Sequence, residues 1–384
     1  MRRILLVLAL LLAVPLVAAE PTAITIESKV LGETRTILVR TPASYAAGTG
    51  RYPVVYLTDG DRQIEHTAAT MDFLARQGRM PESIAVGVVN TDRTRDLTPT
   101  HVPESAFGTQ TFRAPTSGGA GKFLQFMETE VIPLVESRYR TQPYRVFAGH
   151  SFGGLFAMHA FTTRPQLFNA VVAVSPTLTW DNRYVFRRVT ELVKAQKELD
   201  RTLVVTLGNE GAELDRELAS LRELLEKSAP KGLDWTLQTF ADEDHGSVVM
   251  PSHYLGLRKS FAAWRFALDP TDDPKTTFAR ARAHYAKLSQ RAGYTIAIPE
   301  GTTNQIGYRL LQAGHVAEAI EVFKANTEAY PASANVYDSL GESYERAGDA
   351  TRAKESYARA WARGKELSDP NTATYKVNLD RVSK

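Results

Sequence analysis

Residues 144–161 read YRVFAGHSFGGLFAMHAF, two apolar runs joined by a glycine-rich turn. The first run is typical of a β-strand and the second of a buried helix. Between them Ser151 stands in the pattern G-x-S-x-G, with Gly149 and Gly153 on either side. A turn that presents a serine hydroxyl at the end of a strand strains the backbone and leaves no room for side chains two residues before and after it. The stretch therefore predicts a strand–turn–helix with Ser151 as a nucleophile.

Similar apolar runs recur through the first two thirds of the chain and alternate with amphipathic segments such as 119–138 and 212–228. These apolar runs, as distinct from the amphipathic segments, lie at 22–31, 34–42, 52–60, 83–90, 168–176, 202–210 and 234–240. The first two predict a hairpin around Gly32, and the last alternates in polarity, as expected of a strand nearer an edge. Apolar strands alternating with helices predict an α/β fold, a mostly parallel central sheet flanked by helices on both faces.

A serine hydroxyl is a weak nucleophile without a base, and in the α/β-hydrolase arrangement the chain order is serine, acid, histidine. His245 lies in FADEDHGSVV (240–249), after the last predicted strand and before the final helix of this region. It is the expected base, and His253 is the alternative.

The acid should follow the strand at 202–207, because its carboxylate must reach the imidazole and hold it in the right tautomer. Glu210 is nearest to that strand end and is the predicted acid, with Glu213 as the alternative. Further acidic residues stand near the two loops: Asp215, Asp242 and Asp244.

Acyl transfer also needs N–H donors for the oxyanion. The N–H of Phe152, directly after the serine, is one candidate. The loop after the strand at 52–57, which reads TDGDRQ, supplies the second at Asp61 or Gly60.

Three residues are weaker candidates for binding substrate. Arg93 and Arg95 in DRTRDLTP (92–99) would either bind a polar or anionic substrate or pair with neighbouring aspartates. Trp180 would either line the pocket or pack in the core. No metal-binding spacing appears in the sequence, so neither a metal nor a cofactor is expected.

The first 19 residues, MRRILLVLALLLAVPLVAA, have a basic tip, a short apolar run and small residues at the end. This layout predicts a secretory signal peptide cleaved after Ala19, and therefore a periplasmic or secreted bacterial protein with no membrane span after cleavage. The chain has no cysteine, so neither a disulfide nor a thiol nucleophile is possible. A formal net charge of +3 gives no reason to expect nucleic acid as a partner.

The pattern changes at LDPTDDPKTT (268–277), which predicts an esterase domain over 20–268, a linker at 269–275 and a helical tail at 276–384. Within the tail, 306–326 and 340–360 align with a shift of 34 residues: Gly307 matches Gly341 and Phe323 matches Tyr357. This period resembles tetratricopeptide repeats, at about 304–365. Such repeats imply a protein partner or self-association.

Six segments together resemble the putative-esterase family of α/β-hydrolases, and in particular its siderophore trilactone esterase branch. They read YLTDGD, DRTRDLTP, GHSFGG, VSPTLTWD, LGNEGAE and DEDHGSV. The resemblance implies that Ser151 and His245 are the nucleophile and the base, and that the ester cleaved is a small molecule, such as a catecholate–serine ester.

The expected function is thus a serine esterase that works through an acyl-enzyme. The alternatives are an acyltransferase of the same fold and a non-catalytic binding protein that uses the repeats.

Overall fold

The computed structural model describes residues 20–46, 48–107 and 110–384; the predicted signal peptide lies outside them. The chain divides into two compact units, Met1–Ala262 and Ala263–Lys384. Residues 263–268, which the sequence assigned to the esterase domain, are grouped with the second unit, where Phe266 and Leu268 pack against its core. The two units are described separately below.

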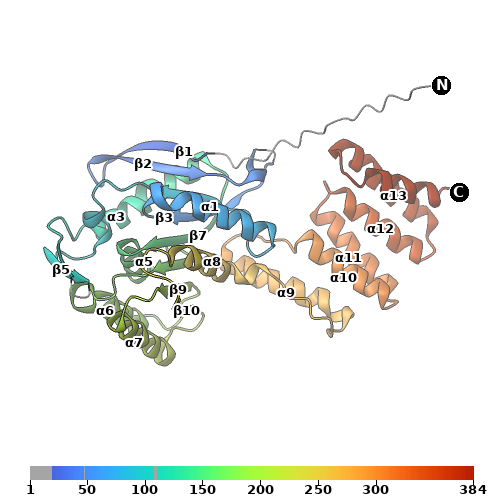
Figure 1. Ribbon diagram of the computed structural model, residues 1–384. Helices are drawn as coiled ribbons and strands as arrows, with labels where there is room; N and C mark the ends of the chain where they lie inside the picture. Colours follow the sequence, from blue (N-terminus) through green and yellow to red (C-terminus); the bar gives the residue numbers. More distant parts are fainter. Residues whose placement is uncertain (1–19, 47, 108–109) are drawn as a thin grey trace, which may run out of the picture. The chain divides into compact units, whose positions relative to one another are not determined.

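The first unit is built on an eight-stranded sheet with the order β1-β2-β4-β3-β7-β8-β9-β10 (Figure 1). The predicted hairpin at Gly32 is present as an antiparallel pair, and β2 also runs antiparallel to β4. The remaining pairs are parallel. The strands are β1 (Thr22–Ser28), β2 (Glu33–Arg40), β3 (Tyr52–Leu57), β4 (Ile84–Val88), β7 (Thr141–His150), β8 (Ala170–Val174), β9 (Thr202–Leu207) and β10 (Asp234–Thr239).

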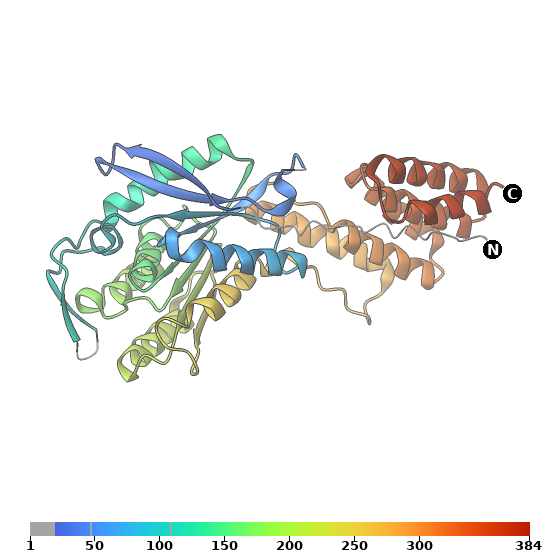
Figure 2. The same cartoon turned by 45° about the horizontal axis from the view of Figure 1, so that its top comes forward.

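Helices cover both faces of this sheet (Figures 1 and 2). The helices α1 (Gly60–Arg76) and α8 (Val249–Ser260) pack against each other, while α5 (Phe152–Thr163) contacts α2 (Arg93–Leu97), α3 (Ala120–Phe126) and α6 (Trp180–Ala195). The helix α7 (Ala212–Ser228) contacts α6 and β10. Every residue of β3, β4, β8 and β9 is buried, as expected of parallel strands covered on both sides. The α/β-hydrolase fold predicted from the alternation of strands and helices is confirmed.

Two local features were not predicted. The amphipathic segment 119–138 is interrupted by a π-helical turn at Met127–Val131, between α3 and α4 (Ile132–Arg138). There Glu130 accepts hydrogen bonds from Ser28 and from the N–H groups of Lys29 and Val30, which fixes the β1–β2 turn. In addition, β5 (Glu104–Phe107) and β6 (Gln110–Arg113) form a separate two-stranded sheet.

The second unit is entirely helical in the part that the structure describes. Its helices are α9 (Pro274–Ala292), α10 (Glu300–Gln312), α11 (Val316–Ala329), α12 (Ala334–Arg346), α13 (Ala350–Leu367) and α14 (Thr372–Arg381). The predicted repeat corresponds to the pairs α10–α11 and α12–α13. A Cβ atom at Gly307 would lie 2.5 Å from the ring of Phe323, and one at Gly341 would lie 2.7 Å from the ring of Tyr357. The residues matched by the 34-residue shift therefore make the same contact in each pair, whereas the assignment to the tetratricopeptide family stays a prediction.

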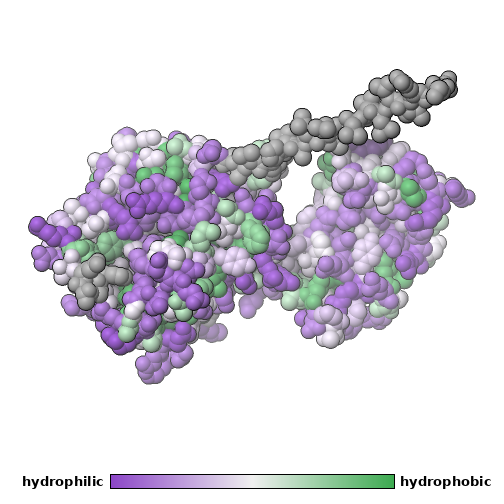
Figure 3. All heavy atoms as spheres, viewed as in Figure 1, coloured by the Kyte–Doolittle hydropathy of each residue, from purple (hydrophilic) through white to green (hydrophobic). Residues whose placement is uncertain are grey.

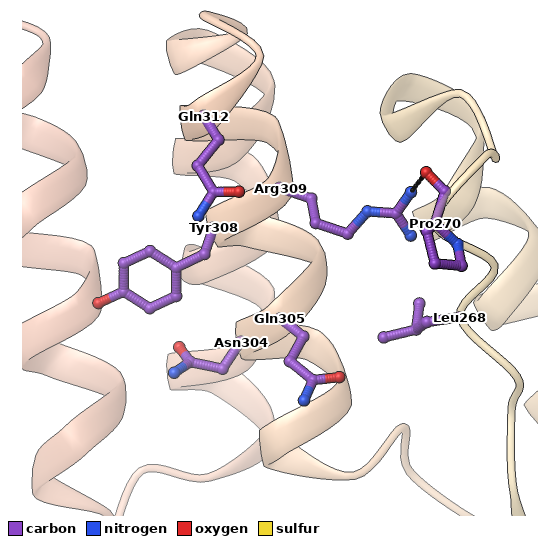
Figure 4. Close-up of a pocket in the computed structure, with 7 residues that line it drawn as sticks. All are labelled: Leu268, Pro270, Asn304, Gln305, Tyr308, Arg309 and Gln312. Carbon is purple, nitrogen blue, oxygen red and sulfur yellow. Dashed lines mark hydrogen bonds between the residues drawn. The ribbon is translucent and has the colours of Figure 1, made fainter.

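A hollow in the second unit lies between α10 and the segment before α9 (Figure 4). Arg309 reaches across it and donates hydrogen bonds to the carbonyl oxygens of Pro270 and Asp272, each over 3.1 Å. On the face shown in Figure 3, polar residues predominate and apolar residues form small patches. Among the helices of the described ranges, none is long and apolar enough to cross a membrane.

Candidate active site

Ser151 lies where β7 ends and α5 begins, at the carboxyl edge of the sheet. Its backbone has φ 62° and ψ −117°, a strained conformation for a residue with a side chain. A Cβ atom at Gly149 would lie 2.3 Å from the carbonyl oxygen of Gly153, and one at Gly153 would lie 2.3 Å from Oγ1 of Thr58. The two glycines are therefore required by close contacts on both sides of the turn, as the pattern predicted.

Glu210 and His245 are joined by a short hydrogen bond. The Nδ1 atom of His245 lies 2.5 Å from Oε2 of Glu210, although the residues are 35 positions apart. The ring of His245 also lies against that of His150, which immediately precedes Ser151, with ring centroids 4.7 Å apart. The structure thus brings the predicted acid and base together and places the base against the residue that precedes the predicted nucleophile.

The carboxylate of Glu210 is almost fully enclosed, with 3 % of its side chain exposed. Its Oε1 atom accepts hydrogen bonds from the Ser175 hydroxyl at 2.5 Å and from the Gly208 N–H at 3.0 Å. Burial alone would raise the pKa of Glu210, but the hydrogen bonds from His245, Ser175 and Gly208 outweigh it and hold the pKa below its usual value. An ionised carboxylate is the form that can orient an imidazole and stabilise its positive charge.

The loop that carries His245 is locked against the loop that carries Glu210. A Cβ atom at Gly208 would lie 2.6 Å from the carbonyl oxygen of Asp244, so glycine permits the close approach. The Asp244 carboxylate accepts from the N–H groups of Gly246 and Ser247 at 2.8 and 2.7 Å. Asp244 therefore shapes the turn around His245.

The alternative acid and base lie elsewhere. Glu213 is exposed in the first turn of α7. His253 is buried on α8, where its Nδ1 lies 2.9 Å from the Thr67 hydroxyl and its ring stacks on His66. These positions favour Glu210 and His245.

The predicted oxyanion donors stand at the starts of two helices. Phe152 is the first residue of α5 and Asp61 the second of α1, and the first N–H groups of a helix have no partner within it. Asp59 adopts the left-handed conformation with φ 53°, and a Cβ atom at Gly60 would lie 2.4 Å from the backbone of Gly87. The tight turn before α1 is thus held against β4.

Arg93 and Arg95 both form ion pairs. Arg93 donates to the Asp59 carboxylate at 2.6 Å and to the carbonyl oxygen of His150 at 3.0 Å. Arg95 pairs with Glu33 and Asp96. Each arginine side chain is 33 % exposed. The contacts favour the structural interpretation of both arginines.

Trp180 is 1 % exposed, and its Nε1–H donates to the Thr100 hydroxyl over 3.0 Å. Its ring packs edge-on against Phe152, with centroids 5.5 Å apart. These contacts favour the core-packing interpretation, with Trp180 against the residue that follows Ser151.

The sequence interpretation missed Ser175 and His150. Ser175 directly follows the strand at 170–174, at the same sheet edge as Ser151, so its position was a usable signal. His150 stands inside the G-x-S-x-G pattern, where only the serine and glycines have a role in the motif itself.

The fold and these side chains define an α/β-hydrolase. A model of the family described as "Putative esterase" matches residues 28–270, and the chain belongs to that family. It is 30 % identical over 248 residues to the ferri-bacillibactin esterase BesA of Bacillus subtilis, covering 57 % of this chain and 80 % of the relative. It is 29 % identical over 257 residues to the siderophore triacetylfusarinine C esterase of Aspergillus fumigatus, covering 57 % and 85 %.

Among solved structures, the chain is similar to an IroE-like serine hydrolase from Shewanella oneidensis. The identity is 30 % and the TM-score 0.69, and the alignment covers 80 % of this chain and 99 % of the other. The protein is accordingly a carboxylic ester hydrolase similar to siderophore esterases.

Proposed function

We propose that the protein is a serine esterase that cleaves siderophore-type esters through an acyl-enzyme on Ser151. The observation that carries the proposal is the 2.5 Å contact between Glu210 and His245, which lies beside the strained turn of Ser151.

In the proposed mechanism, Ser151 attacks the ester carbonyl while His245 takes the hydroxyl proton. The alcohol then leaves with that proton. Water next attacks the acyl-enzyme while His245 accepts its proton, and the carboxylic acid is released from Ser151, which recovers its proton. Glu210 fixes the imidazole through Nδ1, which leaves Nε2 free for the proton transfers. The N–H groups of Phe152 and Asp61 stabilise the oxyanion.

The substrate class is inferred from the relatives, which are named as esterases of ferri-bacillibactin and triacetylfusarinine C. The match to the family model, over residues 28–270, spans most of the first unit, which includes the proposed site. From the resemblance of the six sequence segments to the siderophore trilactone esterase branch, we propose cyclic or linear catecholate–serine esters as the preferred substrates. Because Arg93 and Arg95 already hold carboxylate partners, neither is assigned a substrate contact.

A fluorophosphonate probe tests the nucleophile, since it reacts with activated serines. We expect labelling at Ser151 in the wild-type protein and none in Ser151→Ala, with ester turnover reduced by about 10⁴-fold or more. A Ser151→Ala protein with turnover within about tenfold of wild type would refute the mechanism.

A substrate panel tests the class of ester. We expect a higher kcat/KM for a catecholate–serine trilactone than for p-nitrophenyl butyrate at the same pH. A preference of about tenfold or more for the simple ester, equivalent to about 1.4 kcal/mol, would contradict the siderophore assignment and leave a general esterase. Product analysis with added alcohols separates hydrolysis from acyl transfer. A protein that neither reacts with fluorophosphonate nor cleaves any ester would fit the alternative of a non-catalytic binding protein.

The predicted signal peptide, the periplasmic or secreted location and the tetratricopeptide-like role of 304–365 remain parts of this proposal. Fractionation of cells that express the full chain, with N-terminal sequencing of the mature protein, tests the first two. Co-purification with the separately expressed tail tests whether it recruits a partner.

A further inference from the structure

His150 connects the strand that carries the proposed nucleophile to the loop that carries the proposed base. Its Nε2–H donates a hydrogen bond to the backbone carbonyl oxygen of His245 over 2.6 Å. The two rings are in contact, with centroids 4.7 Å apart and planes inclined by 44°. Resting on the proposed function, we propose that His150 is a positioning residue that fixes His245 relative to Ser151.

The loop around His245 needs such a support because much of it faces solvent. Asp242, Asp244, Gly246 and Ser247 are all exposed. A catalytic group displaced by about 1 Å can lose about 10²-fold in rate, so a base on an exposed loop requires fixed contacts.

The loop's other backbone contacts tie it to the strand of the acid. The N–H of Phe240 donates to the carbonyl oxygen of Leu207 at 2.8 Å, and the N–H of Asn209 donates to that of Glu243 at 2.6 Å. These contacts involve β9 and the residues just after it, and β9 is separated from β7 by β8. They hold His245 near Glu210, whereas the bond from His150 links it to β7 itself.

His150 is a rigid reference point. It is the last residue of β7 and pairs with Val174 in the neighbouring strand. Its carbonyl oxygen accepts a hydrogen bond from Arg93 at 3.0 Å, and Arg93 is held by Asp59 in the turn before α1. The backbone of His150 is thus fixed by the sheet and by Arg93, while its side chain holds the loop of His245.

The protonation state of His150 suits this role. Burial, followed by the nearby charge of His245, lowers the pKa of His150 to about 4. At neutral pH the ring is therefore uncharged, with its single N–H directed at the His245 carbonyl, since a carbonyl oxygen can only accept. An uncharged His150 does not oppose the positive charge that forms on His245 during turnover.

Three substitutions at position 150 separate the effect of the hydrogen bond to His245 from the effect of side-chain size. His150→Leu keeps an apolar side chain of similar size but has no donor. His150→Gln places an amide N–H near the Nε2 position, and His150→Asn carries the same amide one methylene short. The measurements are kcat and KM for one ester, normalised to the concentration of folded protein determined by circular dichroism.

We expect His150→Leu and His150→Asn to lose about 10- to 100-fold in kcat with KM changed less than about threefold, because misplacement of the base affects the chemical step. His150→Gln should recover most of that loss. His159→Leu is the matched control: His159 is a buried histidine of the first unit, with Nδ1 2.8 Å from the Tyr184 hydroxyl, and its loss should leave normalised kcat close to wild type.

The positioning role is overturned if His150→Leu retains normalised kcat within about twofold of wild type, or if Gln is no better than Asn. If the Leu variant does not fold, the Gln and Asn pair decides alone, since these differ by one methylene. Ser151→Ala in the same series tests the proposed function separately. An active Ser151→Ala protein would refute the triad. If Ser151→Ala is inactive but the His150 variants keep the kcat of the wild type, only the positioning role of His150 is refuted.

Discussion

Glu210 is held by three donors, from His245, Ser175 and Gly208, and its side chain has almost no contact with solvent. Glu210→Gln keeps the size of the side chain but removes the charge that stabilises the imidazolium, so kcat should fall by at least about tenfold. Glu213→Gln, on the exposed first turn of α7, is the matched control and should stay near wild type. A larger loss for Glu213→Gln would show that the acid has been assigned to the wrong residue.

Ser175 supports the acid from the opposite side to His245. It adopts a left-handed backbone with φ 40° and donates to Oε1 of Glu210. Ser175→Ala removes one charge-assisted hydrogen bond of roughly 1.5–3 kcal/mol from a carboxylate that remains buried. We expect a decrease in kcat smaller than that of Glu210→Gln, measured on the same ester. An effect as large as that of Glu210→Gln would assign Ser175 a more direct part in the reaction.

At the scale of elements, helix pairing in the second unit depends on glycine facing an aromatic ring. Gly341→Leu would place side-chain atoms where the Tyr357 ring already lies, so we expect it to lower the stability of the second unit by about 1–3 kcal/mol or more. Gly301→Leu is the matched control, since a Cβ atom there has no heavy atom within 4 Å. Thermal unfolding followed by circular dichroism measures both.

Because the proposed site lies wholly in the first unit, fluorophosphonate labelling of Ser151 should persist in Gly341→Leu. Loss of labelling in a variant whose first unit remains folded would show that the helical unit shapes the active site.

The strands were predictable because β3, β4, β8 and β9 are short, continuous apolar runs, a pattern that arises when a strand is buried on both faces. The hairpin β5–β6 was not, since two strands of four residues each carry no periodicity. The π-helical turn was also hidden, because the spacing of apolar residues continues through it.

The site was predictable where the backbone demands particular residues, as at Gly149 and Gly153. The choice between Glu210 and Glu213 depends on how the chain leaves β9, and Gly211, with φ 96°, separates the two. The contact from His150 to the backbone of His245 left no trace in the sequence, since any residue offers the accepting carbonyl oxygen.

At the scale of the whole molecule, three histidines, His159 and His253 buried and His150 half-buried, make the stability of the first unit depend on pH. Burial is the main cause that lowers the pKa of His150 and His159 to about 4 and that of His253 to about 3. Between about pH 4 and pH 6.5 these groups bind protons in the unfolded chain but not in the folded one, so the free energy of unfolding rises with pH across this range. Each contributes up to about 1.4 kcal/mol per pH unit.

Urea unfolding at several pH values across this range measures the slope. His159→Gln removes one of the three groups at a distance from the proposed triad and should make the slope shallower by up to about 1.4 kcal/mol per pH unit. An unchanged slope would mean that His159 takes up its proton equally in both states.

The strained turn of Ser151 is attached to β7, which lies inside the eight-stranded sheet with β3 on one side and β8 on the other. Amides in such a strand exchange with solvent deuterium only when the sheet opens, whereas the edge strands β1 and β10 fray at lower cost. Exchange should therefore slow progressively from either edge towards β7. Ser151, with its strained backbone, is thus attached to the part of the sheet that we expect to exchange most slowly, and a partial opening that releases the edges leaves the proposed nucleophile in place.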